Sequence, residues 1–97
     1  MSLGELPALT ETIRRHGLAA DKRLGQHFLV DPAILARIAA AAEPLAGREV
    51  LEVGPGPGGL TRALLATDAA GVTAIEADPR CVAALEDLVA AAAGRLR

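Results

Sequence analysis

Apolar positions in the first third of the chain predict one short helix followed by a loop. In residues 6–16, Leu9 and Ile13 share one face of a helix, and Gly17 follows as a stop signal. Residues 18–30 show neither the period of a helix nor that of a strand. We therefore expect a loop there.

A second helix is expected to begin at Asp31, because Asp followed by Pro suits the cap and the first position of a helix. This helix should end near Pro44 and Gly47, which are both helix-terminating residues. The apolar side chains expected along one stripe of it are Ile34, Leu35, Ile38 and Ala42.

The period changes after residue 47, and the pattern then favours a strand, a loop, a helix and a second strand. Residues 49–53 are predicted to form a short strand, and a glycine cluster follows at 54–59. A helix is predicted over 60–67 and a second strand over 72–77, with Gly71 between them.

A last helix is expected to open at Asp78-Pro79 and to run towards Gly94. Its predicted inward-facing side chains are Val82, Leu85, Leu88 and Val89. Strand, helix, strand and helix in this order predict an α/β fold, a βαβα unit whose parallel strands are joined by a right-handed crossover. We expect N-terminal helices over 1–47 and the βαβα unit over 48–97.

A third strand is expected just after Arg97, because a parallel sheet of only two strands is marginally stable. We therefore interpret the chain as the N-terminal portion of a larger α/β domain. Composition agrees with this interpretation, since 22 of the 50 apolar residues are Ala and add little buried area. The 97 residues suffice for one domain at most.

Charge and cysteine content exclude several classes of protein. One Lys and nine Arg oppose five Asp and seven Glu, so a strongly basic nucleic-acid-binding tail is absent. Cys81 is the only cysteine, which excludes an intramolecular disulfide and a cysteine-based zinc site. No apolar run approaches the roughly 20 residues that span a bilayer, and residues 1–12 do not resemble a secretory signal. We expect a cytoplasmic protein with no membrane partner.

The glycine cluster is the strongest candidate for a binding site. Gly54, Gly56 and Gly59 match the G-x-G-x-x-G pattern of dinucleotide-binding loops, although that match alone is weak. Pro55 and Pro57 remove two of the N–H groups that a pyrophosphate would need. The carboxylate of the preceding Glu52 also favours a cationic ligand over a polyanion. A tight turn without a ligand is the alternative.

Glu76 is the second candidate, because it ends the second predicted strand 22 positions after Gly54. A carboxylate at this place can accept both hydroxyls of a ribose, one on each oxygen. The alternative is a solvated acid at a strand end. Asp78 is better explained as the cap of the next helix.

Residues 22–29, with the sequence K-R-L-G-Q-H-F-L, contain a basic pair beside an amide, an imidazole and the only aromatic residue of the chain. Taken alone, a single His is usually structural, and Phe28 suits the core. Arg14, Arg15, Lys22 and Arg23 could follow the phosphates of an RNA. Glu11 and Asp21 lie between them, so a solvated surface is the alternative.

Taken together, K-R-L-G-Q-H-F-L, L-E-V-G-P-G-P-G-G-L-T and A-I-E-A-D resemble the ribosomal RNA adenine N6-dimethyltransferase family. These are class I methyltransferases that use S-adenosylmethionine and have a Rossmann-like fold. The resemblance covers about residues 8–97 but only the first part of the family's catalytic domain. Its specific element is G-Q-H-F-L, since the glycine loop and the acid are common to many methyltransferases.

The resemblance implies dimethylation of adenine N6 in small-subunit ribosomal RNA, with S-adenosylmethionine as cofactor, no metal, and a monomeric protein. Gln26, His27 and Leu29 would line the methionine and sulfonium side of the cofactor. Gly54 and Gly56 would form the loop beneath it, and Glu76 would hold its ribose.

No residue of this chain is assigned a catalytic role. The family binds the target base with an Asn-Leu-Pro-Tyr type of motif, and this sequence has neither Asn nor Tyr. Two other classes remain as alternatives. One is part of a nicotinamide-dependent oxidoreductase, against which the loop prolines argue. The other is a non-catalytic ribosome-assembly factor with a methyltransferase fold.

Overall fold

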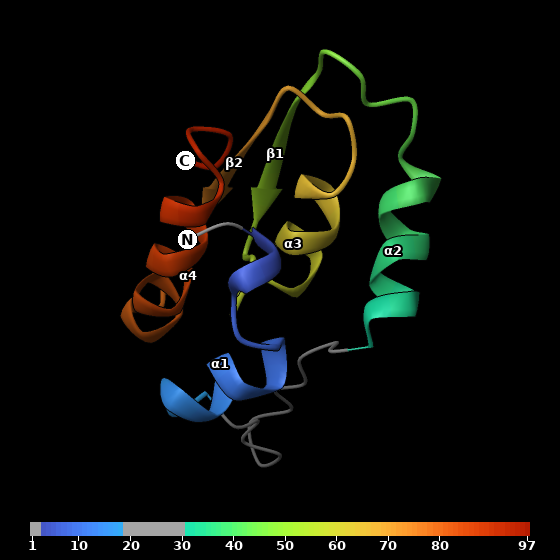
Figure 1. The fold of residues 1–97 in the computed structure, drawn as a ribbon. Helices are drawn as coiled ribbons and strands as arrows, with labels where there is room; N and C mark the ends of the chain where they lie inside the picture. The colour runs from blue at the N-terminus through green and yellow to red at the C-terminus, as the bar shows by residue number, and fades with distance from the viewer. Residues whose placement is uncertain (1–2, 19–30) are drawn as a thin grey trace.

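The computed structural model describes residues 3–18 and 31–97 (Figure 1). Helices dominate it, and they cover one face of a small parallel sheet. In chain order the elements are η1 (Leu3–Glu5), α1 (Leu9–Arg15), α2 (Pro32–Ala41), β1 (Glu49–Val53), α3 (Gly59–Leu65), β2 (Gly71–Ile75) and α4 (Pro79–Ala91). No helix in the described ranges has both the length and the apolar character that crossing a membrane requires.

The sheet confirms the predicted parallel pair. β1 and β2 pair in register from Glu49 opposite Gly71 to Val53 opposite Ile75, with α3 as the connection. The chain end then joins the other edge of β2, where Leu96 forms a parallel bridge with Val72. The third strand expected after residue 97 stays a prediction, and this isolated bridge lies at the edge of β2 beside which it would pair.

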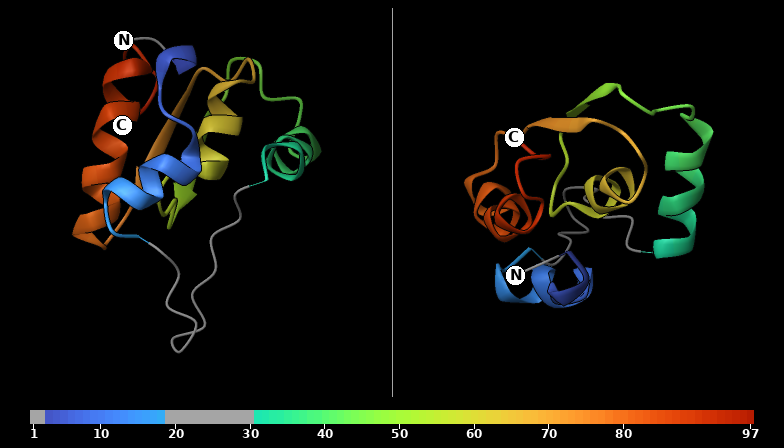
Figure 2. Two further views of the ribbon diagram at one scale, coloured as in Figure 1. Left: turned by 60° about the horizontal axis from the view of Figure 1, so that its bottom comes forward. Right: turned by 45° about the horizontal axis from the view of Figure 1, so that its top comes forward.

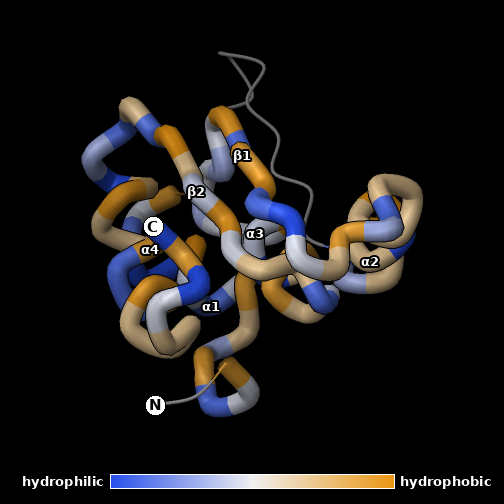
Figure 3. The backbone as a smooth tube through the Cα atoms, turned by 90° about the horizontal axis from the view of Figure 1, so that it is seen from above, coloured by the Kyte–Doolittle hydropathy of each residue, from blue (hydrophilic) through white to orange (hydrophobic). Residues whose placement is uncertain are grey.

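The core lies between one face of this sheet and the helices α3 and α4 (Figure 2). Its central members are Leu64 and Leu65 of α3, Val72 of β2, and Leu85 and Leu88 of α4. Apolar side chains on the other face are largely exposed, and Figure 3 shows the hydrophobic stretches along both strands. The exposed fractions are 63% for Leu51, 75% for Val53 and 55% for Ile75.

Both Asp-Pro pairs begin helices as predicted. The Asp31 carboxylate accepts hydrogen bonds from the N–H groups of Ala33 and Ile34 at the start of α2. The Asp78 carboxylate accepts one from the N–H of Arg80 at the start of α4. Each bond satisfies a helix N–H that has no partner within the helix.

The faces predicted for these two helices are partly wrong. On α2, Leu35 and Ala39 are buried, whereas Ile34 and Ile38 are 41% and 43% exposed and Ala42 is exposed. On α4, Leu85 and Leu88 are buried as expected, but Val82 and Val89 are each 42% exposed. Small side chains complete the buried line of α4 instead, and these are Cys81, Ala84 and Ala91. Small residues allow close packing of a helix, and an apolar stripe alone does not reveal which edge of it is covered.

The N-terminal helix is shorter than predicted. α1 begins at Leu9 rather than residue 6, because the backbone of Ala8 is extended, with a ψ of 149°, and Ala8 is the N-cap of the helix. The Arg62 guanidinium holds the junction between η1 and α1 by donating to the Pro7 carbonyl at 2.7 Å and to the Thr12 hydroxyl at 3.1 Å. The predicted stop at Gly17 is confirmed, since this residue has a φ of +64°.

Candidate functional site

The loop after β1 owes its shape to glycines in left-handed conformations. Gly54, Gly56 and Gly58 have φ angles of +70°, +59° and +100°, which residues with a Cβ adopt only with strain. The N–H of Gly54 donates to the Ile75 carbonyl at 2.8 Å and so continues the pairing of the two strands. The loop is thereby fixed to the end of the sheet where both strands terminate.

A pocket of about 400 Å³ lies beside this loop. Gly54 and Gly56, both predicted as site residues, line it together with Leu35 and Ile38 of α2. A Cβ built on Gly54 would meet no protein atom within 4 Å, so that side of the loop is open. Ile38 was expected on the apolar stripe of its helix, but it is 43% exposed and lines this pocket.

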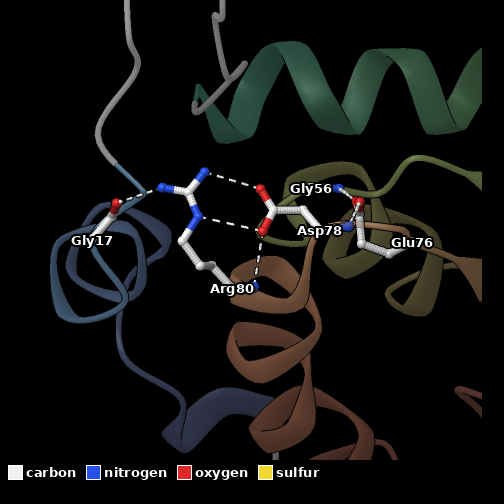
Figure 4. Close-up of polar contacts among 5 residues, drawn as sticks. All are labelled: Gly17, Gly56, Glu76, Asp78 and Arg80. Atoms are coloured by element: carbon white, nitrogen blue, oxygen red, sulfur yellow. Dashed lines mark hydrogen bonds and ion pairs between the residues drawn. The ribbon is translucent and has the colours of Figure 1, made fainter.

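Glu76 follows β2 and joins the two strand ends (Figure 4). Its Oε1 accepts the N–H of Gly56 at 2.8 Å, and its Oε2 accepts the N–H of Asp78 at 3.0 Å. The structure thus brings the predicted residues Glu76 and Gly56 into direct contact. A carboxylate has about four acceptor positions, so each oxygen keeps one for a ligand. The half-buried side chain leaves them reachable.

Glu52 has a different environment, and unlike Glu76 it lines the pocket beside the loop. Its side chain is buried, and its Oε1 accepts a hydrogen bond from the Thr61 hydroxyl at 2.5 Å. Burial raises the pKa of Glu52 above its ordinary value of 4.5, the Thr61 bond opposes that rise, and the charge of Glu76 adds to it. Glu52 is thus a buried carboxyl held by Thr61, whereas Glu76 is bound to the backbone of the loop.

Sequence reasoning missed two residues that shape the loop. A Cβ on Gly58 would lie 2.9 Å from a Leu85 methyl and 3.1 Å from one of Leu88, so a side chain here would force these leucines of α4 to shift. Thr61 holds Glu52 from the first turns of α3. The glycine cluster in the sequence indicated a special role for Gly58, whereas a single Thr in a helix gives no indication of its contact.

Gln26, His27 and Leu29, the other predicted site residues, lie outside the described residues, as do Lys22 and Arg23. Arg14 and Arg15 are described, and both form ion pairs with Glu11 on the exposed surface of α1. These two guanidinium groups lower the pKa of Glu11 to about 2. The positive charge of this helix is therefore partly neutralised.

The described ranges contain no group of three or more His, Cys, Asp or Glu side chains placed to hold a metal ion. The candidate site instead contains a glycine loop that is open on one side, apolar side chains in the pocket wall, and a carboxylate with free acceptor positions. A parallel β–loop–α–β unit with this loop and an acid after the second strand defines the Rossmann-like class of proteins that bind nucleotide cofactors.

Comparison with known proteins identifies the family within this class. Residues 17–95 match the model of the ribosomal RNA adenine dimethylase family, and the chain belongs to that family. Ribosomal RNA small subunit methyltransferase A of Azorhizobium caulinodans is 59% identical over 95 residues, which are 98% of this chain and 33% of the relative. The same protein of Methylobacterium radiotolerans is 60% identical over 97 residues, 99% of this chain and 33% of the relative. The chain thus spans about a third of these relatives' length.

A solved structure supports the fold. A protein assigned as an RNA methyltransferase in Pyrococcus horikoshii matches with a TM-score of 0.61 over 95% of this chain and 49% of that one. The two sequences are 21% identical, so this likeness concerns the fold alone. It agrees with the predicted Rossmann-like α/β architecture.

Proposed function

We propose that this chain supplies the cofactor-binding part of an enzyme that dimethylates adenine N6 in small-subunit ribosomal RNA, using S-adenosylmethionine. Family membership supports the reaction. The observation that carries the cofactor assignment is Glu76, which contacts the Gly56 and Asp78 amides and keeps an acceptor position on each oxygen. Two acceptor positions on one carboxylate suit the two hydroxyls of a ribose.

The surroundings of Glu76 fit this cofactor better than a dinucleotide. The loop has two prolines in place of amide donors, so it is a poor cradle for a pyrophosphate. Glu52 and Glu76 place acidic groups near the loop, which suits a cofactor with a positively charged sulfur. These features argue against the nicotinamide-dependent alternative.

The proposed roles of the residues are to bind and orient. Glu76 would hold the ribose, while Gly54 and Gly56 would let the cofactor approach the backbone on the open side of the loop. Gln26, His27 and Leu29 would line the methionine and sulfonium side. When bound, S-adenosylmethionine supplies an activated methyl group, whose transfer to the amine of an adenine requires an aligned approach. The flipped-out target base would be held by residues beyond these 97.

The proposed partner is ribosomal RNA of the small subunit, and we propose a monomeric, cytoplasmic protein. Arg14 and Arg15 are exposed and available to phosphates once their pairing with Glu11 is exchanged. A role of these arginines in RNA binding thus remains part of the proposal.

The test uses a chain of the relatives' full length that begins with these 97 residues, called the full-length protein below. It is incubated with S-adenosylmethionine and small ribosomal subunits that lack adenine dimethylation, and the digested RNA is analysed by mass spectrometry. We expect N6,N6-dimethyladenosine to form. Binding to the subunits without any methylation would instead support a non-catalytic assembly factor. A thermal shift with NAD but none with S-adenosylmethionine would support an oxidoreductase.

A further inference from the structure

The pocket beside the glycine loop has a single ionisable group in its described wall. Of the described residues that line it, Glu52 alone has a side chain that can carry a charge. The others are glycines, prolines and aliphatic residues from the loop, from the end of β1, and from α2 and α3. Pockets for small ligands are mostly apolar, with a few polar groups that provide specificity. Glu52 is therefore the candidate for that role in this pocket.

One carboxylate oxygen of Glu52 is engaged and the other is not. Oε1 accepts the Thr61 hydroxyl at 2.5 Å, which holds the side chain from α3. Oε2 has no hydrogen-bond partner among the described residues. In these ranges the only fully enclosed side-chain polar atom without a partner is Nε of Arg62, so Oε2 of Glu52 retains access to the pocket that Glu52 lines. A free acceptor position on a largely buried carboxylate favours a positively charged partner.

The described part of the chain supplies no such partner. Burial raises the pKa of Glu52, the Thr61 bond opposes that rise, and the charge of Glu76, which faces it from beyond β2, adds to it. α2 contributes Leu35 and Ile38 to the pocket, and neither is charged. No arginine of the described ranges lowers the pKa of Glu52. The ionised carboxylate thus lacks a counter-ion, which a cationic ligand would supply.

Gly56 connects Glu52 to the proposed ribose site. Its N–H donates to Glu76 at 2.8 Å, and the same residue lines the pocket together with Glu52. A ligand whose ribose is held by Glu76 therefore has to pass only the loop at Gly56 to reach the pocket.

From these contacts we infer that Glu52 is a specificity-determining residue, whose Oε2 receives a positively charged group of the ligand. The inference rests on the proposed function, in which Glu76 binds the ribose of S-adenosylmethionine. That cofactor has two positively charged groups, the sulfonium and the ammonium of its amino-acid end. S-adenosylhomocysteine keeps only the ammonium, and 5′-methylthioadenosine has neither. All three contain the same ribose, so comparing them isolates the contribution of the charged groups.

The test measures the affinity of the full-length protein and its Glu52→Gln variant for these three ligands at pH 7 without RNA. Calorimetry is used, with competition for the weaker ligands. Glu52→Gln can keep the Thr61 bond, but it places an amide donor where Oε2 was. We expect S-adenosylmethionine to bind about tenfold or more weakly, the loss typical of one charge-assisted contact. The affinity for 5′-methylthioadenosine should change by less than about twofold. A loss for S-adenosylhomocysteine as well assigns the contact to the ammonium, and a loss for S-adenosylmethionine alone assigns it to the sulfonium.

Glu49→Gln is the matched control, because it removes a carboxylate from the same strand. Glu49 is exposed, pairs with Arg97 at 3.6 Å and is not among the residues that line the pocket. This variant should leave all three affinities unchanged.

The pH dependence of binding gives a second readout, which a purely structural role of Glu52 would not change. Protonation removes the negative charge of Glu52, so the affinity of the parent for S-adenosylmethionine should fall between pH 7 and pH 5. The fall should be smaller in Glu52→Gln, which has no charge to lose at this position. Titration of Glu76 and of the ligand occurs in both proteins and cancels in the comparison.

Three results would overturn the inference. One is unchanged or tighter binding of S-adenosylmethionine by Glu52→Gln. Another is an equal loss for all three ligands, which would show that the substitution disturbs the pocket rather than its charge. The third is an equal pH dependence in the two proteins. Failure of the proposed function would look different, because the parent itself would then bind none of the three ligands.

Discussion

Two carboxylates beside the glycine loop differ in what surrounds them, and this difference separates their roles. Glu76 is half-buried and accepts two backbone N–H groups, which fixes its orientation while leaving acceptor positions. Glu52 is buried and accepts a single hydroxyl, from Thr61. Burial favours the neutral form of a carboxyl group. The environment of Glu76 therefore suits ligand binding, whereas that of Glu52 makes the stability of the fold sensitive to pH.

The raised pKa of Glu52 gives a prediction with a definite sign. A carboxyl whose pKa is higher in the folded than in the unfolded chain binds more protons when folded. Its stabilising contribution is complete below pH 4.5 and is lost as the pH rises through the raised pKa. Glu52→Gln stays neutral and can still accept the Thr61 hydroxyl. We therefore expect this variant of the full-length protein to be more stable than the parent at pH 7.

Urea unfolding at pH 4 and pH 7 checks this prediction. The stability difference between Glu52→Gln and the parent should be near zero at pH 4 and favour the variant at pH 7. Glu86→Gln, a change at an exposed glutamate of α4, is the control and should show no such pH dependence. A Glu52→Gln protein that is less stable than the parent at pH 7 would show that the charged form is required in the fold.

At the scale of elements, the loop between β1 and α3 determines the site. Gly54, Gly56 and Gly58 have positive φ, and Gly58 is also closely packed, whereas Gly54 is not. Gly54 has open space on its side-chain side, where the cofactor is proposed to lie. The loop thus has one face that packs on α4 and another that is available to a ligand.

This division predicts different outcomes for two alanine substitutions. Gly54→Ala should cost about 1–2 kcal/mol from its backbone conformation alone and should also weaken cofactor binding. Gly58→Ala has the same backbone cost plus the clash with Leu85, so it should destabilise the fold more. Chemical denaturation and calorimetry on the full-length protein measure both effects.

Gly4→Ala is the matched control, because Gly4 is exposed, has open space around it and lacks a positive φ. It should change neither stability nor cofactor affinity by a measurable amount. Normal stability and normal cofactor binding in Gly54→Ala would remove the reason for interpreting this loop as a site.

The sequence predicted the elements of this fold better than their contacts. Strand 49–53 and the two Asp-Pro helix starts are confirmed, because capping residues and glycine breaks act locally. The second predicted strand, over 72–77, is observed at Gly71–Ile75, and the short helix after the loop begins at Gly59. The division of the chain at residue 47 stays a prediction.

What could not be predicted depends on contacts distant in sequence. The buried edges of α2 and α4 are set by Ala39, Cys81 and Ala84, whose small size hides them in an apolar pattern. The contact of Glu76 with Gly56 spans 20 residues and joins two backbone segments that only the folded sheet brings together. The pairing of Gly54, Gly56 and Glu76 as one site was expected from the family resemblance, whereas the connecting hydrogen bonds were not.

At the scale of the whole molecule, the sheet is covered on one face only. Leu51, Val53 and Ile75 are more than half exposed on the other face, and β1 has no described partner strand on its outer edge. An uncovered parallel sheet is unusual, because both faces of such sheets are normally buried. The fold therefore leaves apolar surface that further structure would cover.

We predict that the 97-residue chain alone is marginally folded and does not methylate RNA. Its alanine-rich helices bury too little area to offset an ordering cost of about 1–2 kcal/mol per residue. Circular dichroism should show helix with a broad, weakly cooperative melt, and cofactor affinity should lie far below that of the full-length protein. A sharp melt together with methyl transfer to ribosomal RNA would show that the domain is already complete at residue 97.

The most direct test of the proposed site is calorimetry of S-adenosylmethionine binding to the full-length protein and to its Glu76→Ala variant. Each lost hydrogen bond between the carboxylate and a ribose hydroxyl is worth roughly 1.5–3 kcal/mol when buried. We expect Glu76→Ala to weaken binding at least tenfold while the circular dichroism spectrum stays close to that of the parent. The unfolding midpoint should fall somewhat, because the N–H groups of Gly56 and Asp78 lose their acceptor. Unchanged affinity in a folded Glu76→Ala protein would contradict the proposed role of Glu76.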